Sequence, residues 1–274
     1  MSSVDTFRGL TDCCQNVFTR PVPSRSFSTV ACLALAPVLA ACARKSDSYP
    51  FSIPPEGFFQ QTEIIALTPV SMPEEIRQQA AAAGEFDSLI AAVLTDAGYS
   101  LVSVDDYLAV WGHILDQMGG VSDPITGERD EAKFELARER LYLDLSEMYY
   151  ADAVLYPEIW TVDAPFAEGV ASWDGTSQAM VEFGIRVLDF IGAILTRSES
   201  QLPRGTVRAL SLMVFMEDMN GVEVFSDAGG IELLEQVGTD PGSLQVVPEE
   251  ELFQDRERSR KAVDQALRRL VDRT

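Results

Sequence analysis

Cysteine and histidine are the side chains of this chain that could act as nucleophiles or bind a transition metal, and there are four cysteines and one histidine. The cysteines, Cys13, Cys14, Cys32 and Cys42, all precede residue 43. A zinc site or a Ser-His-Asp triad would have to rest on the single imidazole ring of His113. No G-x-S-x-G or P-loop pattern occurs. We therefore expect no catalytic residue, no metal and no cofactor, and we interpret His113 as an exposed helical residue.

Carboxylates offer two further kinds of chemistry. The loop 119–130 is rich in oxygen ligands, but counting from Asp123 puts Ile125 and Gly127 where an EF-hand needs oxygens. A turn in which Asp130 caps the next helix is the simpler interpretation, and a weak Ca²⁺ site stays an alternative. The run 249–251 is Glu-Glu-Glu, and a glycosidase needs two carboxylates about 5–10 Å apart. With 43 acidic residues, such pairs arise by chance.

Two short segments resemble turns. "SWDGT" at 172–176 places Trp173, Asp174 and Gly175 between strands, and these three residues are our candidate partner contact. The alternative is that Trp173 packs against the edge of the domain. "DAGGIEL" contains Gly229 and Gly230, which suit a turn with positive φ.

The amino-terminal region has the layout of a secretory signal. Residues 27–41, "FSTVACLALAPVLAA", carry no charge, and Arg8, Arg20 and Arg25 precede them. A positive leader, a short apolar run and small residues at its end are typical of a signal peptide. The run is too short for a transmembrane helix, which needs about 20 residues.

The end of this run, Leu39-Ala40-Ala41-Cys42, resembles the lipobox of bacterial lipoproteins. The resemblance implies cleavage between Ala41 and Cys42 and acylation of Cys42, including palmitate-type chains. Two or three acyl chains anchor a protein stably to a membrane. Ala43 follows the cysteine, and in a Gram-negative cell this is compatible with transport to the outer membrane. The expected location is therefore the cell envelope, on the periplasmic side of the outer membrane. Because the leader is long, a start downstream of Met1 is an alternative.

Composition limits the partners and divides the chain. The net charge of −22 disfavours nucleic acid and anionic membrane surfaces, which need basic footprints. The hydrophobic share of 46% is ordinary for a globular domain. We expect residues 1–41 to be the signal, residues 42–61 a lipidated flexible tether, and residues 62–274 a single periplasmic domain.

Hydrophobic periodicity predicts an α/β (α+β) fold with a mixed sheet of about five to six strands, flanked by helices and ending in a β-hairpin and a C-terminal helix. Asp105 is expected to cap the second helix, and Pro157 to mark an edge or an irregularity. Asn220-Gly221 is a strong hairpin signal. The predicted strands are 63–70, 100–104, 153–162, 177–189, 205–218 and 222–226, and the predicted helices are 73–99, 105–118, 131–150 and 255–271.

This element order, with "IIALTPV", "ADAVLYPEI" and "KAVDQALRRLV" at corresponding places, resembles the periplasmic CsgG, LpoB and TolB amino-terminal group. The resemblance implies a non-enzymatic protein that acts through contacts with a periplasmic or outer-membrane protein in envelope assembly or maintenance. A small-ligand or transport accessory lipoprotein and a carboxylate-dependent glycan or peptidoglycan hydrolase are the alternatives.

Overall fold

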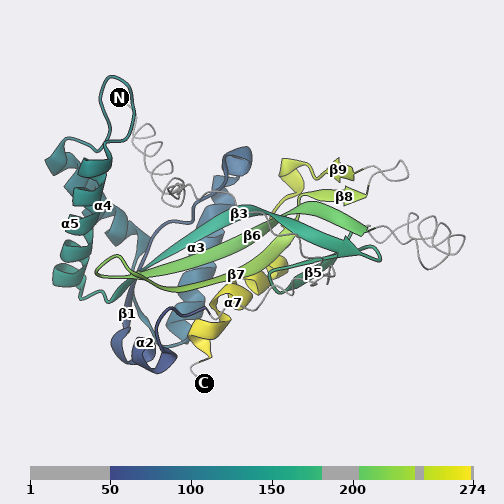
Figure 1. Cartoon of the computed structure of the whole chain (residues 1–274), viewed down its shortest axis with the longest axis horizontal. Helices are drawn as coiled ribbons and strands as arrows, with labels where there is room; N and C mark the ends of the chain where they lie inside the picture. Colours follow the sequence, from purple (N-terminus) through teal and green to yellow (C-terminus); the bar gives the residue numbers. More distant parts are fainter. Residues whose placement is uncertain (1–49, 181–203, 238–243, 273–274) are drawn as a thin grey trace, which may run out of the picture. The chain divides into compact units, whose positions relative to one another are not determined.

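The computed structural model describes residues 50–180, 204–237 and 244–272, which form a mixed sheet of seven strands, a separate pair of strands and flanking helices (Figure 1). The predicted mixed α/β fold is confirmed, with more strands than expected. The expected signal and Cys42 lie outside the described residues. The strands of the sheet are β1 (Ile64–Leu67), β2 (Ser100–Val102), β3 (Ala153–Ala167), β4 (Val170–Trp173), β5 (Thr176–Ala179), β6 (Arg204–Asp218) and β7 (Glu223–Leu233). The remaining elements are α2 (Pro55–Gln61), η1 (Glu74–Gln79), α3 (Ala80–Asp96), α4 (Val104–Met118), α5 (Glu131–Tyr149), β8 (Glu235–Val237), β9 (Leu244–Val246), η3 (Glu249–Glu251) and α7 (Arg256–Val271).

Two long strands form the centre of the sheet. β3 and β6 pair antiparallel along their full length, from Ala153 opposite Asp218 to Ala167 opposite Arg204. On one side of this pair, β1 and β2 add parallel strands, which require the helical crossovers α3 and α4–α5. On the other side β7 pairs antiparallel with β6 through the predicted turn at Asn220-Gly221.

One face of the sheet is covered by α3 and α7. Alternate side chains of β3 and β6, such as Leu155 and Leu212, point into this core because side chains in a strand alternate between faces. The apolar stripe predicted for the closing helix is buried here, except for Val271, which is exposed in the last turn. The fully buried members of the stripe are Ala262, Val263, Ala266, Leu267 and Leu270.

Gly229 and Gly230 lie within β7, so the expected turn at "DAGGIEL" is wrong. Neither glycine has a positive φ. Both are needed because other groups approach the backbone closely. A Cβ on Gly229 would lie 2.0 Å from the carbonyl oxygen of Ala262 in α7, and one on Gly230 would lie 2.7 Å from Nε1 of Trp173. The missing side chains let α7 and the β4–β5 hairpin press on opposite faces of β7.

Gly229→Ala should destabilise the fold by about 1–3 kcal/mol or more, because the new methyl group meets backbone that cannot rotate away. Gly84→Ala makes the same chemical change in the interior of α3, where nothing lies within 4 Å of the added Cβ. That variant should stabilise the protein by about 0.5–1 kcal/mol. Urea unfolding of both variants measures the difference, and equal effects would contradict the close approach of α7.

Residues 50–61 pack on the domain, so the expected tether is wrong over this range. Pro50 and Ser52 hydrogen-bond to the edge of β7, where the Ser52 N–H donates to Val224 O at 3.1 Å. Phe51 and Phe58 are buried, and the ring centroid of Phe51 lies 5.0 Å from that of Phe225. The prolines that suggested a linker instead introduce α2, since Pro55 occupies its first turn.

Phe58→Ala should lower the unfolding free energy by about 3–5 kcal/mol, as for a buried phenylalanine. Gln61→Ala, at an exposed position of the same helix, should cost less than about 0.5 kcal/mol. Thermal or denaturant melts distinguish the two. A negligible effect of Phe58→Ala would restore the tether interpretation.

The observed ends of the helices and strands differ in places from the predicted ones. Ser103, not Asp105, caps α4, because its side chain accepts the Asp106 N–H at 3.1 Å. Asp130 caps α5 as predicted, and Asp255 caps α7. Pro157 lies inside β3. Its carbonyl accepts the N–H of Ser71 at 3.0 Å, and Ser71 lies beyond the end of β1. The predicted irregularity is therefore in the segment that follows β1 and not in β3 itself. Of the strand predicted at 177–189, residues 181–189 lie outside the described residues.

Candidate functional site

The helical pair α4–α5 lies at one end of the sheet (Figure 1). α5 turns Phe134, Ala137, Leu141 and Leu145 inward, and the ring centroids of Trp111 in α4 and Phe134 are 6.0 Å apart. Met148 continues the same apolar spacing but is exposed, in the last turn of the helix. α5 is therefore held along one side by an apolar contact.

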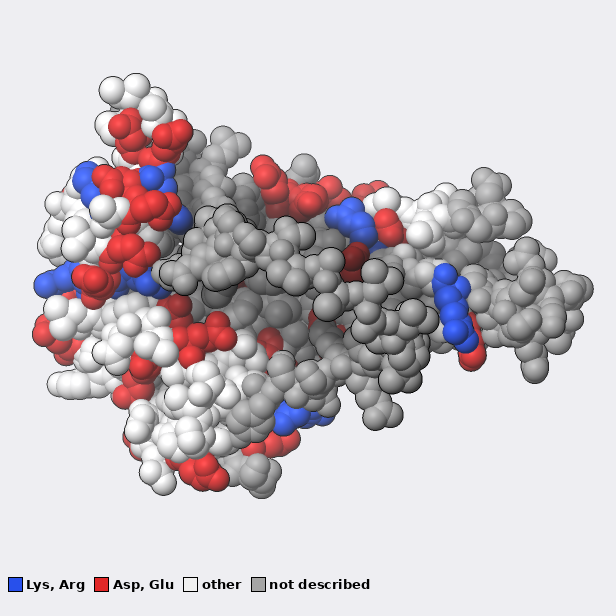
Figure 2. Space-filling view, in the orientation of Figure 1, with Lys and Arg blue, Asp and Glu red and all other residues white. Residues whose placement is uncertain are grey.

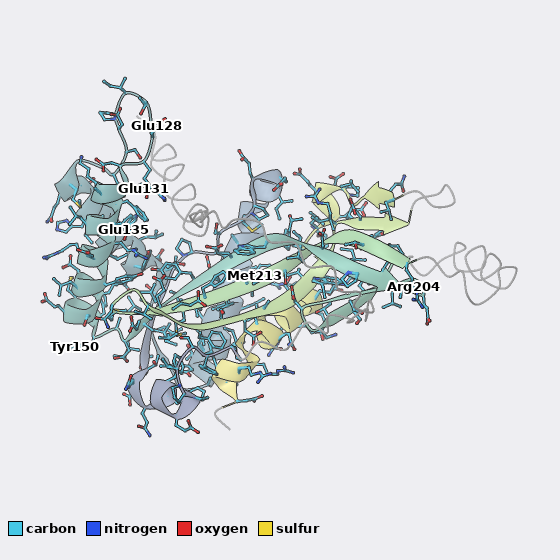
Figure 3. The ribbon with its side chains drawn as sticks, viewed as in Figure 1. Glu128, Glu131, Glu135, Tyr150, Arg204 and Met213 are labelled. Carbon is cyan, nitrogen blue, oxygen red and sulfur yellow. The ribbon has the colours of Figure 1, made fainter. Side chains whose placement is uncertain are left out.

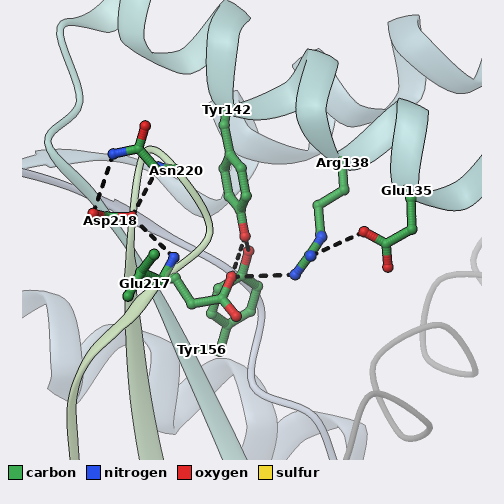
Figure 4. A network of polar contacts seen from close by, with 8 residues as sticks. Glu135, Arg138, Tyr142, Tyr156, Glu217, Asp218 and Asn220 are labelled. Carbon is green, nitrogen blue, oxygen red and sulfur yellow. Dashed lines mark hydrogen bonds and ion pairs between the residues drawn. The ribbon is translucent and has the colours of Figure 1, made fainter. Parts of the chain in front are cut away.

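A polar network ties α5 to the β6–β7 hairpin (Figure 4). The Tyr142 hydroxyl donates to Glu217 Oε2 and lies 3.0 Å from the Tyr156 hydroxyl. Arg138 Nη1 is 3.6 Å from the same carboxylate, and Arg138 Nη2 donates to Glu135 at 3.0 Å. Helix α5, strand β3 and strand β6 each supply part of this network, which we call the Glu217 network.

Burial controls the electrostatics of the Glu217 network. Desolvation raises the pKa of Glu217 above its ordinary value, although the bonds from Tyr142 and Arg138 favour the charged form. Burial also raises the pKa of Tyr142 and of Tyr156, so both stay neutral donors at physiological pH. The network therefore fixes α5 on the sheet through one partly buried carboxylate.

Burial raises the pKa of several carboxyl groups, and this predicts how stability depends on pH. In each case the folded protein holds its proton to a higher pH than the unfolded chain. The stabilisation is complete below the unfolded pKa and is lost as pH rises through the higher folded value. The urea midpoint should therefore be higher at pH 5.5 than at pH 7.5. The groups are Asp87, Glu158, Glu217, Asp227 and Glu232.

Glu217→Gln should weaken this pH dependence, because the amide cannot titrate. Glu139→Gln, at an exposed position of α5, makes the same change in net charge and serves as the control. A midpoint that rises from pH 5.5 to pH 7.5 in the wild-type protein would contradict the direction of these shifts.

The sheet face beyond the Glu217 network carries a second carboxylate, Glu158. Trp160 Nε1 donates to it at 2.7 Å, and burial raises its pKa. Met213 lies opposite Glu158 in the register, near the middle of β6 (Figure 3). Glu217 is opposite Val154, so four residues of strand, about 13 Å, separate the two carboxylates. They bond to different neighbours and do not form the close pair of a glycosidase.

Trp173, Asp174 and Gly175, the candidate partner contact, form a structural clasp on β7, and a partner contact at the exposed Gly175 stays a prediction. Trp173 is buried, and its Nε1 donates to Leu210 O at 3.0 Å. The Gly230 N–H donates to Asp174 O at 3.0 Å, and Ser211 Oγ donates to Asp174 Oδ2 at 2.7 Å. Gly175, with φ of 76°, turns the chain. The clasp covers an edge strand, which would otherwise be open to pairing with other chains.

A Cβ on Gly175 would lie 2.6 Å from the Gln265 side chain, so the turn of the clasp reaches α7. The turn "SWDGT" predicted from the sequence is correct as a turn, and the alternative in which Trp173 packs is the one observed. Asp174 and Gly175 serve the same packing.

The other predicted sites stay apart from one another. His113 is exposed, and its Nε2 is 2.7 Å from Gln117 Nε2. In the loop before α5, Asp123 Oδ1 accepts the N–H groups of Ile125 and Thr126, which lowers the pKa of Asp123. Residues 249–251 form the exposed η3. Across the described ranges, no three His, Cys, Asp or Glu side chains are grouped so that they could hold a metal ion.

The side of α5 away from the sheet carries apolar residues that the sequence analysis did not single out. Leu136, Leu143 and Tyr150 are 57%, 46% and 74% exposed. Leu136 and Leu143, seven residues apart, lie along one line of the helix, within about 20° of each other. Tyr150 follows just past the helix end with a positive φ of 57°. We call these three residues with Arg140 and Glu147 the outer face of α5. Tyr150, just past the helix end, is labelled in Figure 3.

The sequence contained a signal for this surface. Leu136 and Leu143 fall between the residues of the predicted buried stripe, so α5 is apolar on two sides. Only the structure shows which side faces the sheet.

No protein family matches the chain, and no curated protein is significantly similar to it in sequence. Within the part of the chain that the structure describes, none of the helices is long and apolar enough to cross a membrane.

Proposed function

We propose that this protein is anchored to the cell envelope by acyl chains on Cys42 and acts there, without catalysis, through protein contacts made by the outer face of α5. The anchor rests on the sequence Leu39-Ala40-Ala41-Cys42 and the apolar run before it. The contact role rests on one observation: Leu136 and Leu143 are aligned and exposed on α5, with Tyr150 exposed just past the helix end, while the opposite side of the helix is packed on the domain.

The exposed residues support a contact because they lie close to one another on one side of α5. Single apolar residues on a surface are common and need no explanation. Leu136 and Leu143 occupy two positions seven residues apart on one side of the helix, a spacing that helix-in-groove contacts use. The Glu217 network and the Trp111–Phe134 contact hold α5 in place, so little conformational entropy is lost on binding.

Charge supports a protein partner over an anionic surface. Figure 2 shows acidic, basic and uncharged side chains interspersed over the region of α4 and α5. The chain as a whole carries −22, which repels nucleic acid and anionic lipid headgroups. A partner with a mixed, partly apolar helical surface fits this region best. The proposed place for such contacts is the periplasmic side of the outer membrane, in envelope assembly or maintenance.

Cys42→Ser should prevent acylation and move the protein out of the membrane fraction, or leave an uncleaved precursor. Fractionation and mass spectrometry of the amino terminus check this. Finding the wild-type protein unacylated, with an amino terminus upstream of residue 42, would refute the anchor.

The contact is tested separately by chemical crosslinking of the anchored protein in its own cells. Leu143→Glu should leave the membrane fraction unchanged and remove crosslinked species that wild type forms. Lys261→Glu, at an exposed position of α7, is the control. Crosslinked species that survive Leu143→Glu would overturn the role of α5.

A further inference from the structure

We propose that the partner of the outer face of α5 is a second copy of this chain, bound antiparallel across a twofold axis close to Leu143; this inference rests on the proposed function. A twofold interface brings the same surface of both copies together, so the surface must be complementary to itself. The order of side chains on the outer face of α5 meets this condition.

The apolar residues match across the axis. An α-helix rises 1.5 Å per residue, so Leu136 lies about 10.5 Å before Leu143, and α5 ends at Tyr149, about 9 Å after it. In an antiparallel pair centred on Leu143, the two Leu143 side chains meet, and the Leu136 of each copy is level with the end of the other copy's α5, where Tyr150 follows. All three residues are exposed and available for this contact.

The charges match as well. Arg140 lies about 4.5 Å before Leu143 and Glu147 about 6 Å after it, so in the antiparallel pair they are level to within about one residue. Arg140 and Glu147 project from the same side of the line through Leu136 and Leu143. The twofold axis places this side of one helix next to the same side of the helix in the second copy. Each pair therefore contains two symmetry-related Arg140–Glu147 contacts between opposite charges.

The existing contacts of these residues permit this arrangement. Arg140 Nη2 binds Asp144 within its own helix at 2.8 Å, while its side chain remains 55% exposed. Glu147 is exposed. On the other side of the line through Leu136 and Leu143, Glu139 is level with Ser146 of the second copy, so no like charges are forced together there. A parallel pair would instead place Arg140 beside Arg140 and Glu147 beside Glu147, which disfavours it.

A single helix pair is a small interface, and stable interfaces usually bury more than about 1,000 Å². The dimer should therefore be weak in solution. Anchoring of both copies to one membrane raises their effective concentration, so a weak contact is sufficient there. Weak, concentration-dependent self-association in solution, strengthened when both copies are anchored to one membrane, is the specific behaviour that this geometry predicts.

Sedimentation of the full chain in nonionic detergent, over a wide concentration range, tests the dimer. The wild-type protein should associate reversibly to a dimer. Glu147→Arg should raise the dimer dissociation constant about tenfold or more, because two symmetry-related attractions become repulsions at once. Leu143→Glu should do the same by placing two carboxylates on the axis. Glu257→Arg, with the same charge change at an exposed position of α7, should behave as wild type.

A mixture of two charge-reversed variants tests the antiparallel pairing most directly. Arg140→Glu and Glu147→Arg should each fail to self-associate, and an equal mixture of the two should form a mixed dimer, since both contacts are again between opposite charges. Arg140→Glu removes the ion-pair partner of Asp144 and could prevent folding. In that case the dissociation constants of Leu143→Glu and Glu147→Arg test the dimer on their own. A wild-type monomer at all concentrations, or a dimer indifferent to these changes, would overturn the proposal. Leu143-dependent crosslinks of the anchored protein that contain a different protein and no second copy of this chain would overturn only the dimer, and the proposed function would stand.

Discussion

The antiparallel pairing of β3 with β6 is the interaction on which the rest of this structure depends. It runs without a break from Ala153–Asp218 to Ala167–Arg204. Because side chains alternate along each strand, this one register determines which residues face α3 and α7 and which face α5 and the β4–β5 hairpin. A slip of one residue would expose Leu155 and Leu212 and bury Glu158 and Glu217. The register therefore sets both the core and the position of the helix proposed to make contacts.

The two faces of the sheet have different chemistry. The face under α7 is apolar and packs so closely that Gly229 has no room for a side chain. Among the described residues, α5 covers one end of the opposite face and the Trp173 clasp covers the other. The polar groups on this face, Glu217 above all, determine the orientation of α5. A partly buried carboxylate that is bound by several neighbouring groups is satisfied in only one arrangement of those groups. We infer that the contacts at this end of the molecule hold α5 in one orientation, with its outer face exposed.

Much of the fold follows from local sequence patterns. The closing helix, the β6–β7 hairpin and β1 were predicted because their signals, an apolar stripe, Asn-Gly and a short apolar run, lie within a few residues. The tether was wrong over residues 50–61 because Phe51 packs on Phe225, which is distant in the chain, and Phe58 packs on Phe51. Gly229 and Gly230 were misread because a glycine pair suits a turn as well as a close approach, and only the neighbouring α7 distinguishes the two. Tyr142, Tyr156 and Glu217 share no motif, so the network they form was not predictable. The predicted lipid anchor at Cys42 has its support in the sequence alone.

The most direct measurement places a photocrosslinking amino acid at position 143 of the anchored protein in its own cells, with position 260 on α7 as the matched exposed site. If the outer face of α5 binds a second copy, illumination should give an adduct with the mass of two chains from position 143 and none from position 260. No adduct from position 143, or an equal yield from both positions, would contradict α5 as the contact surface.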